Sequence, residues 1–401
     1  MNFKRRTLNV VFIVITLLFS TPKALGQGLI WENVKYLGGF TLPHVPDDPI
    51  SNFSYAAGAF AISEDGNSVF IVGHTRDQAI AELNIPEFTG RSNIKDMKRA
   101  SFKQGFSKLF TKVRDRNSQK INRITGMKII EGQLFVNAMT YYDGGSDNTH
   151  TTLILRTPDD LEASKVAGFF ETRGAAHTTG WISPVPKQYQ MALKSEYLVG
   201  NASNFPITSR SSVGPSLFTF NPFGVLDKSI NSGMIITETV LDFSLKHPMH
   251  ADLYNEKKSN DIWTITSKAF VGFISQTEEY IVVGTSAGHK RGLGYKIKQL
   301  NGRLCGGPCP LDPKDEYNYF WIWEMDRLIK PDDAMTSSHN IQPSRYGNLT
   351  LPHLNGLVIG GYFDSARNRL YLLESNADRK SKYVILPVMR IYQLPPLQSA
   401  K

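Results

Sequence analysis

A repeated pair of apolar runs, joined by a polar turn, is the feature that most constrains how this chain can fold. In each copy the turn is rich in polar residues, and both flanking runs are rich in residues that favour β-strands. This pattern is typical of a β-hairpin. Four copies occur, at residues 59–72, 127–136, 273–283 and 362–373. Helical periodicity is hard to find beyond the first residues, so the sequence predicts an all-β protein.

The spacing of the copies favours a β-propeller. The second runs begin at Val69, Leu134, Tyr280 and Leu370, at intervals of 65, 146 and 90 residues. We interpret these intervals as multiples of a unit of roughly 50 residues, the size of a four-stranded blade. The longest interval then holds two more units and the last interval one, marked by the run 319–323. We therefore predict seven blades, with a β-sandwich or two smaller β domains as the competing fold.

The first residues predict export. Three cationic residues at 4–6 precede an apolar stretch at 7–19, and small residues follow up to Gly26. This order is typical of a signal peptide, and the apolar stretch is too short to span a bilayer comfortably. We predict that residues 1–26 are a signal peptide cleaved after Gly26, and that residues 27–401 form one propeller domain. The mature protein is expected to be secreted, to the extracellular space or the periplasm, with no membrane span.

The charge balance points to a class of partner. The formal net charge is +9, and four of the cationic residues lie in the predicted signal peptide, which leaves +5 for the mature chain. In an exported protein, a basic excess favours an anionic polysaccharide over nucleic acid, although an ordinary soluble surface explains it equally well. We expect a monomer.

The two cysteines and the absence of common motifs limit the chemistry. Cys305 and Cys309 are four residues apart, and in an oxidising compartment they predict a disulfide in a small loop. Without neighbouring histidines they make a poor zinc site. The sequence has no H-E-x-x-H, Walker or dinucleotide-binding motif. No cofactor and no metal site are predicted, and a structural metal ion is left open.

Residues 284–288 read Gly-Thr-Ser-Ala-Gly, which matches the nucleophile elbow of hydrolases. That elbow requires a turn from a strand into a helix. The residues that follow, at 289–294, have no helical character. We therefore interpret the motif as a glycine-rich loop.

Polar segments supply the candidate site residues. The loop at 141–150 carries Tyr142 and His150, and the segment 176–181 carries His177, which also suits a structural role beside a buried tryptophan. Arg210 precedes a predicted strand, at a blade end where it can bind an acidic group through two hydrogen bonds. Tyr254 follows two histidines.

A basic loop adds Lys290, Arg291 and Tyr295 as candidate substrate-binding residues. A cationic run of this kind also suits a solvated surface.

The loop from Tyr141 to His150 and the turn around Arg210, with Gly214 and Pro215, resemble segments of secreted bacterial propellers that include polysaccharide lyases of the ulvan lyase type. The resemblance covers the middle of the chain best. It implies β-elimination on a polysaccharide that contains uronic acid and can be sulfated.

The resemblance also implies roles for the candidates. Removal of the C5 proton of a uronate requires a cation on the carboxylate, and Arg210 is the first choice. His150 would be the base, and Tyr254 or Tyr142 would protonate the leaving oxygen. His177 would help to neutralise the carboxylate.

Two other classes remain open at this point. The first is a non-catalytic propeller that binds carbohydrate or a cell surface. The second is a hydrolase with paired carboxylates, for which the sequence offers no local pair.

Overall fold

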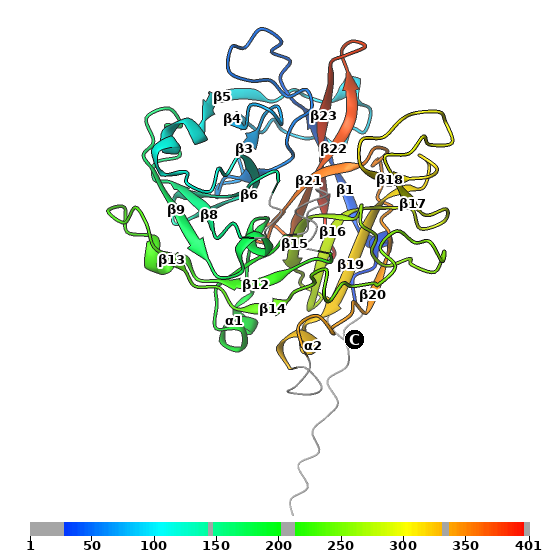
Figure 1. Ribbon diagram of the computed structural model, residues 1–401. Coiled ribbons are helices and arrows are strands. Elements are labelled where there is room, and N and C mark those ends of the chain that lie inside the picture. Colours follow the sequence, from blue (N-terminus) through cyan, green and yellow to red (C-terminus); the bar gives the residue numbers. More distant parts are fainter. Residues whose placement is uncertain (1–27, 143–146, 202–212, 331–336, 397–401) are drawn as a thin grey trace, which may run out of the picture.

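The computed structural model describes residues 28–142, 147–201, 213–330 and 337–396, which fold into a β-propeller. The predicted signal peptide, residues 1–26, lies outside the described residues. Figure 1 shows the sheets arranged around a common centre, with β6, β15 and β21 close to it. Five sheets of four or five strands form the blades. The prediction of an all-β propeller is therefore confirmed.

Blades 1 to 3 form the first part of the ring. Counted from the central channel outward, blade 1 contains β2 (Phe60–Ile62), β3 (Ser68–Val72), β4 (Ala79–Asn84) and β5 (Ser101–Lys108). Blade 2 contains β6 (Arg123–Ile130), β7 (Gln133–Met139), β8 (His150–Leu155), β9 (Val166–Thr172) and a short parallel strand, β13 (Met234–Ile235). Blade 3 contains β10 (Ile182–Pro184), β11 (Tyr197–Val199), β12 (Leu217–Phe220) and β14 (Thr239–Leu241).

Blades 4 and 5 complete the ring. In the same outward order, blade 4 contains β15 (Lys268–Ile274), β16 (Glu279–Ala287), β19 (Glu316–Glu324) and β20 (Arg345–Asn348). Blade 5 contains β21 (Val358–Asp364), β22 (Arg369–Arg379), β23 (Ile385–Gln393) and β1 (Lys35–Thr41). Strand β1 pairs antiparallel with β23, so an early strand of the chain completes the last blade.

The innermost strands close a ring around the channel. Strand β2 contacts β6 and β21, β10 contacts β6 and β15, and β15 contacts β21. Glycines allow this close approach. A Cβ atom at Gly58 would lie 1.9 Å from the carbonyl oxygen of Ile359, and one at Gly360 would lie 1.8 Å from the carbonyl oxygen of Gly58. Larger side chains at these two positions would push blades 1 and 5 apart.

The four predicted hairpins are real, and each forms the two inner strands of a blade. They are β2–β3, β6–β7, β15–β16 and β21–β22. The prediction of seven blades is wrong, because the described residues contain five. The second strands of successive blades begin between 64 and 90 residues apart, well above the expected unit.

Two features of the chain explain the error. Blade 3 gives no hairpin signature, because its inner strands have three residues each and are separated by the helix α1 (Lys187–Leu193). The run at 319–323 marks no blade of its own, since it lies within β19, the third strand of blade 4. The extra length of blade 4 is an excursion between β16 and β19, which holds β17 (Leu293–Tyr295) and β18 (Pro308–Pro310).

Helices are few and short. The second α-helix is α2 (Met325–Ile329), and the 3-10 helices are η1 (Trp31–Asn33), η2 (Ile94–Asp96), η3 (Leu109–Arg116), η4 (Ala175–Thr178) and η6 (Pro222–Val225). In the described ranges, none of the helices is long and apolar enough to cross a membrane. The predicted disulfide between Cys305 and Cys309 is present in the excursion of blade 4.

The hydrophobic core lies between neighbouring blades. One buried cluster joins blades 1, 2 and 5, and the others fill the spaces between blades 2 and 3, 3 and 4, and 4 and 5. Aromatic residues fill much of this space, for example Phe273 and Phe363, whose rings stack 4.1 Å apart. The blades are therefore held by side-chain packing, and hydrogen bonds act mainly within each blade.

Topology assigns every connection to one of two faces. The innermost strand of each blade begins at the same end of the channel, and we name this end the upper face. It carries the connections between blades and those between second and third strands of each blade. The opposite end is the lower face.

Candidate functional site

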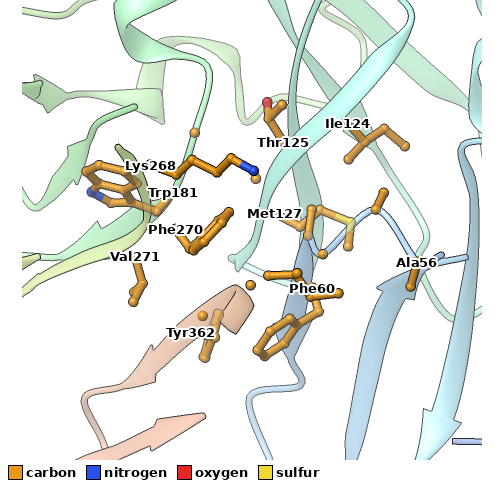
Figure 2. Close-up of a pocket in the computed structure, with 18 of the residues that line it drawn as sticks. Ala56, Phe60, Ile124, Thr125, Met127, Trp181, Lys268, Phe270, Val271 and Tyr362 are labelled. Atoms are coloured by element: carbon orange, nitrogen blue, oxygen red, sulfur yellow. The ribbon is translucent and has the colours of Figure 1, made fainter. Parts of the chain in front are cut away.

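A cavity of about 450 Å³ occupies the upper part of the channel. Residues from the innermost strands of all five blades, or from the segments directly before them, line it. The described residues that line it include apolar side chains such as Phe60, Met127 and Trp181, which Figure 2 shows around the space. Its volume is within the range of small-ligand sites.

The charged side chains in the described lining are both cationic. They are Arg123 and Lys268, the first residues of β6 and β15, and no described lining residue is an aspartate, a glutamate or a histidine. Figure 2 shows Lys268 reaching from the side of Trp181 toward Thr125. The cavity therefore favours an anionic ligand.

The ammonium of Lys268 makes no hydrogen bond or ion pair with any residue that the structure describes. Burial lowers the pKa of Lys268, and the charge of Glu316 offsets part of this effect. An unpaired cation in such a place is unfavourable for stability. An anion bound beside it would supply the missing partner.

Arg123 stands at the upper opening. One of its terminal nitrogens donates to the carbonyl oxygen of Asn122 at 2.9 Å. Its guanidinium lies over the ring of Tyr141, 5.1 Å from the centroid, and the ring of Tyr142 meets Tyr141 edge to face at 4.5 Å. Tyr142 is 63% exposed. The predicted substrate-binding residue Tyr142 is thus linked to the cavity through Tyr141 and Arg123.

All the predicted site residues in the described part come from connections or strand ends of the upper face. Tyr142 and His150 lie on blade 2, and His177 lies between blades 2 and 3. The remaining predicted residues gather on blade 4 or on the connection before it, and they are Tyr254, Lys290, Arg291 and Tyr295. Arg210 lies outside the described residues.

The structure does not bring all of these residues together. Blade 3 separates His150 from the group on blade 4. Among the described residues, no hydrogen bond, ion pair or ring contact joins His150 to Tyr254, the base and acid that the resemblance implied.

His150 is exposed at the start of β8 and has no carboxylate partner in the described part. Its Nδ1 lies 2.9 Å from the hydroxyl of Thr149, and its backbone N–H donates to the side chain of Gln119 at 3.0 Å. Neither contact fixes the tautomer of the ring as a carboxylate would.

His177 has the stronger geometry for proton transfer. Its Nδ1 contacts the carboxylate of Asp242, and its side chain is 13% exposed. Its carbonyl oxygen accepts a hydrogen bond from the hydroxyl of Ser216. A carboxylate at Nδ1 favours the tautomer with the free lone pair on Nε2, the arrangement of a general base. His177 is three residues from Gly180, which lines the cavity.

The group on blade 4 forms a polar surface. The carbonyl oxygen of Tyr254 accepts from the N–H of Leu293 at 2.9 Å, and burial, followed by the neighbouring Tyr295, raises the pKa of Tyr254. Arg291 is paired with Asp312 at 3.4 Å. Lys290 lies over the ring of Tyr317, 5.6 Å from its centroid.

The Gly-Thr-Ser-Ala-Gly motif is not a nucleophile elbow. Ser286 lies in β16, is 1% exposed, and is followed by turns and the short strand β17. Its hydroxyl lies 2.7 Å from Nε2 of His289, whose Nδ1 lies 2.9 Å from the carbonyl oxygen of Asn260. Burial lowers the pKa of His289. This serine and histidine hold the base of the excursion and leave no room for a substrate at the hydroxyl.

Among the described residues, no group of three or more histidine, cysteine, aspartate or glutamate side chains is placed to hold a metal ion.

Comparisons with known proteins give little beyond the fold. No family model matches the sequence, and no curated protein matches it. Among solved structures, the chain is similar to the WD40 repeats of RRP9, at 10% identity over 92% of this chain and 100% of that one, with a TM-score of 0.35. It is also similar to a glycosyl hydrolase from Bacteroides ovatus, at 8% identity over 94% of this chain and 96% of that one, with a TM-score of 0.37. At these TM-scores neither likeness supports an argument about function, and the strand pairing establishes the propeller.

Arg123 and Lys268 were not among the residues predicted from sequence motifs. Each is a cation at the first position of an innermost strand, directly after a polar loop. Both lie before the hairpins recognised in the sequence, which begin at residues 127 and 273, so the sequence pattern alone did not mark them.

Proposed function

We propose that this protein binds an anionic glycan at the upper opening of the channel and cleaves it by β-elimination beside a uronate carboxylate. The observation that carries the proposal is the cavity lining, with two cations and no acidic side chain among the described residues. Tyr55, which is 61% exposed, and the pair Tyr141 and Tyr142 add aromatic surface at the opening. Aromatic rings with a polar edge suit the mixed surface of a sugar.

The elimination places specific demands on these groups. A base takes the C5 proton of the uronate, the bond from C4 to the glycosidic oxygen breaks, a double bond forms between C4 and C5, and an acid protonates the leaving oxygen. Negative charge builds up on the carboxylate in the transition state. Cations fixed beside it lower the barrier. Lys268 and Arg123 take the role first proposed for Arg210.

His177 is the proposed base. Its pairing with Asp242 supports this role better than the surroundings of His150 support His150. Tyr254 is the proposed acid, because burial raises its pKa and keeps the phenol protonated. It belongs to the same connection between blades 3 and 4 as Asp242.

A binding protein without catalysis is the second candidate. It is favoured by the absence of imidazole and carboxylate groups from the described cavity lining. The fold and the two cations suit it equally well. An extracellular location belongs to both proposals and is supported by the disulfide, because disulfides persist in oxidising compartments.

The test is incubation of the protein with ulvan and with polygalacturonate, followed by the ultraviolet absorbance of an unsaturated uronate. Binding is measured in parallel by calorimetry. New absorbance supports the lyase, and binding without new absorbance supports the non-catalytic protein. Neither binding nor absorbance with either polymer overturns the proposed function.

A further inference from the structure

The cavity ends within the channel. Its lining takes Arg123–Met127 from β6, which continues to Ile130, and Lys268–Val271 from β15, which continues to Ile274. The lower halves of both strands contribute nothing to it. The space that opens at the upper face therefore ends halfway down β6 and β15, whereas along β21 its lining continues to Phe363, one residue before the end of that strand.

Side chains that meet at the bottom of the lining account for this end, and two of them, Phe60 and Tyr362, are themselves lining residues. Lys128 follows the lowest lining residue of β6, and its ammonium donates to the hydroxyl of Tyr362 at 2.7 Å. Lys128 belongs to blade 2 and Tyr362 to blade 5, so this contact bridges two blades that are not neighbours in the ring. The ring of Phe60, from blade 1 between them, lies 6.2 Å from that of Tyr362.

The position of the cations fits a ligand that enters from one side. Lys268 and Arg123 are the first residues of their strands, so both charges lie toward the upper opening, and the described lining below them is mainly apolar. A carboxylate that reaches Lys268 lies inside the cavity. An uninterrupted polymer would need a groove open at both ends to place an internal residue there.

We infer that the cavity takes the end of a glycan chain, and that the ligand is an oligosaccharide or polysaccharide with a uronate at or next to its terminus. This inference rests on the proposed function. The volume of about 450 Å³ suits a ligand of roughly two sugar rings. Attack from the chain end is the mode of action that follows for a lyase.

The experiment counts protein molecules per glycan chain. Ulvan is separated into fractions of defined length, from short oligosaccharides to polymer, and each fraction is titrated by calorimetry at equal concentrations of chain ends. We expect one protein per chain at every length, with the same affinity. A number of bound proteins that rises with chain length overturns the inference and leaves the proposed function standing. Absence of binding at every length overturns both.

Two variants locate the binding. Ala56 is half-buried in the lining, and Ala56→Trp narrows the opening, whereas Ala163→Trp places the same side chain on an exposed lower-face loop as a matched control. We expect Ala56→Trp to weaken binding of short and long chains alike by at least tenfold, and Ala163→Trp to leave it unchanged. Unchanged binding in a folded Ala56→Trp protein overturns the inference. Should that variant fail to fold, Lys268→Met serves instead, with tenfold weaker binding of short chains expected and unchanged binding overturning the inference.

Discussion

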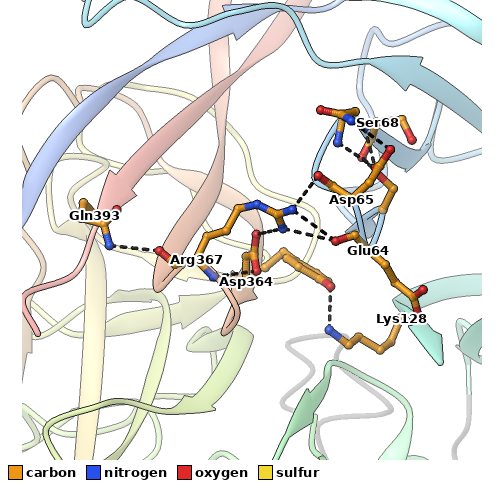
Figure 3. A network of polar contacts seen from close by, with 10 residues as sticks. Glu64, Asp65, Ser68, Lys128, Asp364, Arg367 and Gln393 are labelled. Atoms are coloured by element: carbon orange, nitrogen blue, oxygen red, sulfur yellow. Dashed lines mark hydrogen bonds and ion pairs between the residues drawn. The ribbon is translucent and has the colours of Figure 1, made fainter. Parts of the chain in front are cut away.

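The cations at the two ends of the channel differ in whether other residues of the fold pair with them. At the lower face, Arg367 donates to the carboxylate of Asp364 at 2.9 Å and to the backbone carbonyls of Glu64 and Asp65, a network seen in Figure 3. It ties blade 5 to blade 1. At the upper face, Lys268 points into a cavity and makes no hydrogen bond or ion pair with any described residue, although the charge of Glu316 acts on it from a distance.

The pKa directions reflect this difference. The hydrogen bond from Arg367 to Asp364 raises the pKa of Arg367, whereas burial lowers the pKa of Lys268. A cation whose charge is satisfied within the fold contributes to stability. A partly buried cation without such a partner lowers stability. We expect it to be retained where a bound anion pairs with it. Under the proposed function, the lower end of the ring is structural and the upper end binds the ligand.

The largest effect is expected at His177, on the upper face. His177→Asn removes the proposed base, and general-base catalysis contributes roughly 100- to 10,000-fold to a rate. We expect a fall of about 1,000-fold in turnover on ulvan with little change in binding. His150→Asn is the control, and a larger fall in that variant would return the base to His150.

Lys268→Met tests directly whether the cation of the upper face serves binding at the expense of stability. It should weaken binding of a uronate oligosaccharide by roughly 10- to 100-fold, the range for a hydrogen bond to a charged group. The melting temperature of the free protein should rise, because the variant removes an unpaired, partly buried charge. Calorimetry and thermal unfolding give the two readouts. Lys165→Met, in the exposed lower-face loop between β8 and β9, should change neither.

Arg367→Met should give the opposite result at the lower face. It removes the cationic partner of the buried Asp364 carboxylate, which keeps the hydrogen bond from the backbone N–H of residue 367. It also removes the hydrogen bond to the carbonyl oxygen of Asp65 on blade 1. We expect a loss of about 1 to 3 kcal/mol in the free energy of unfolding, measured with denaturant. Glycan affinity should stay unchanged, and a marked loss of affinity would show that the two ends are coupled.

The smallest effect is a dependence on pH. Binding of a uronate should weaken as pH rises through the lowered pKa of Lys268, because only the ammonium attracts the carboxylate. Arg123 stays charged and keeps part of the affinity. Without ligand, the unfolded chain holds this proton more tightly than the folded one, so stability should rise between the lowered pKa and the ordinary lysine value. Titration of wild type against Lys268→Met isolates both contributions.

Much of the fold could be predicted from the sequence, because four inner hairpins combine strong strand formers with tight turns. The blade count could not. Blade 3 depends on tertiary packing to hold three-residue strands on both sides of a helix. The spacing of the other hairpins then suggested too short a unit.

The candidate site was predicted less well than the fold. Polar loops pointed to the upper face, but the sequence could not show that blade 3 separates His150 from Tyr254. The pairing of His177 with Asp242 joins residues 65 positions apart, and no local pattern marks it. Lys268 and Arg123 could not be assigned to one cavity from the sequence, because only the closed ring brings their strands together.

The pairing of β1 with β23 has a consequence for biosynthesis. The partners Lys35 and Gln393 are more than 350 residues apart, so the last blade cannot form until nearly the whole polypeptide has left the ribosome. Until then β1 has no partner strand, and an unpaired strand edge invites pairing with another molecule. A nascent or truncated polypeptide is therefore expected to aggregate more readily than the complete chain.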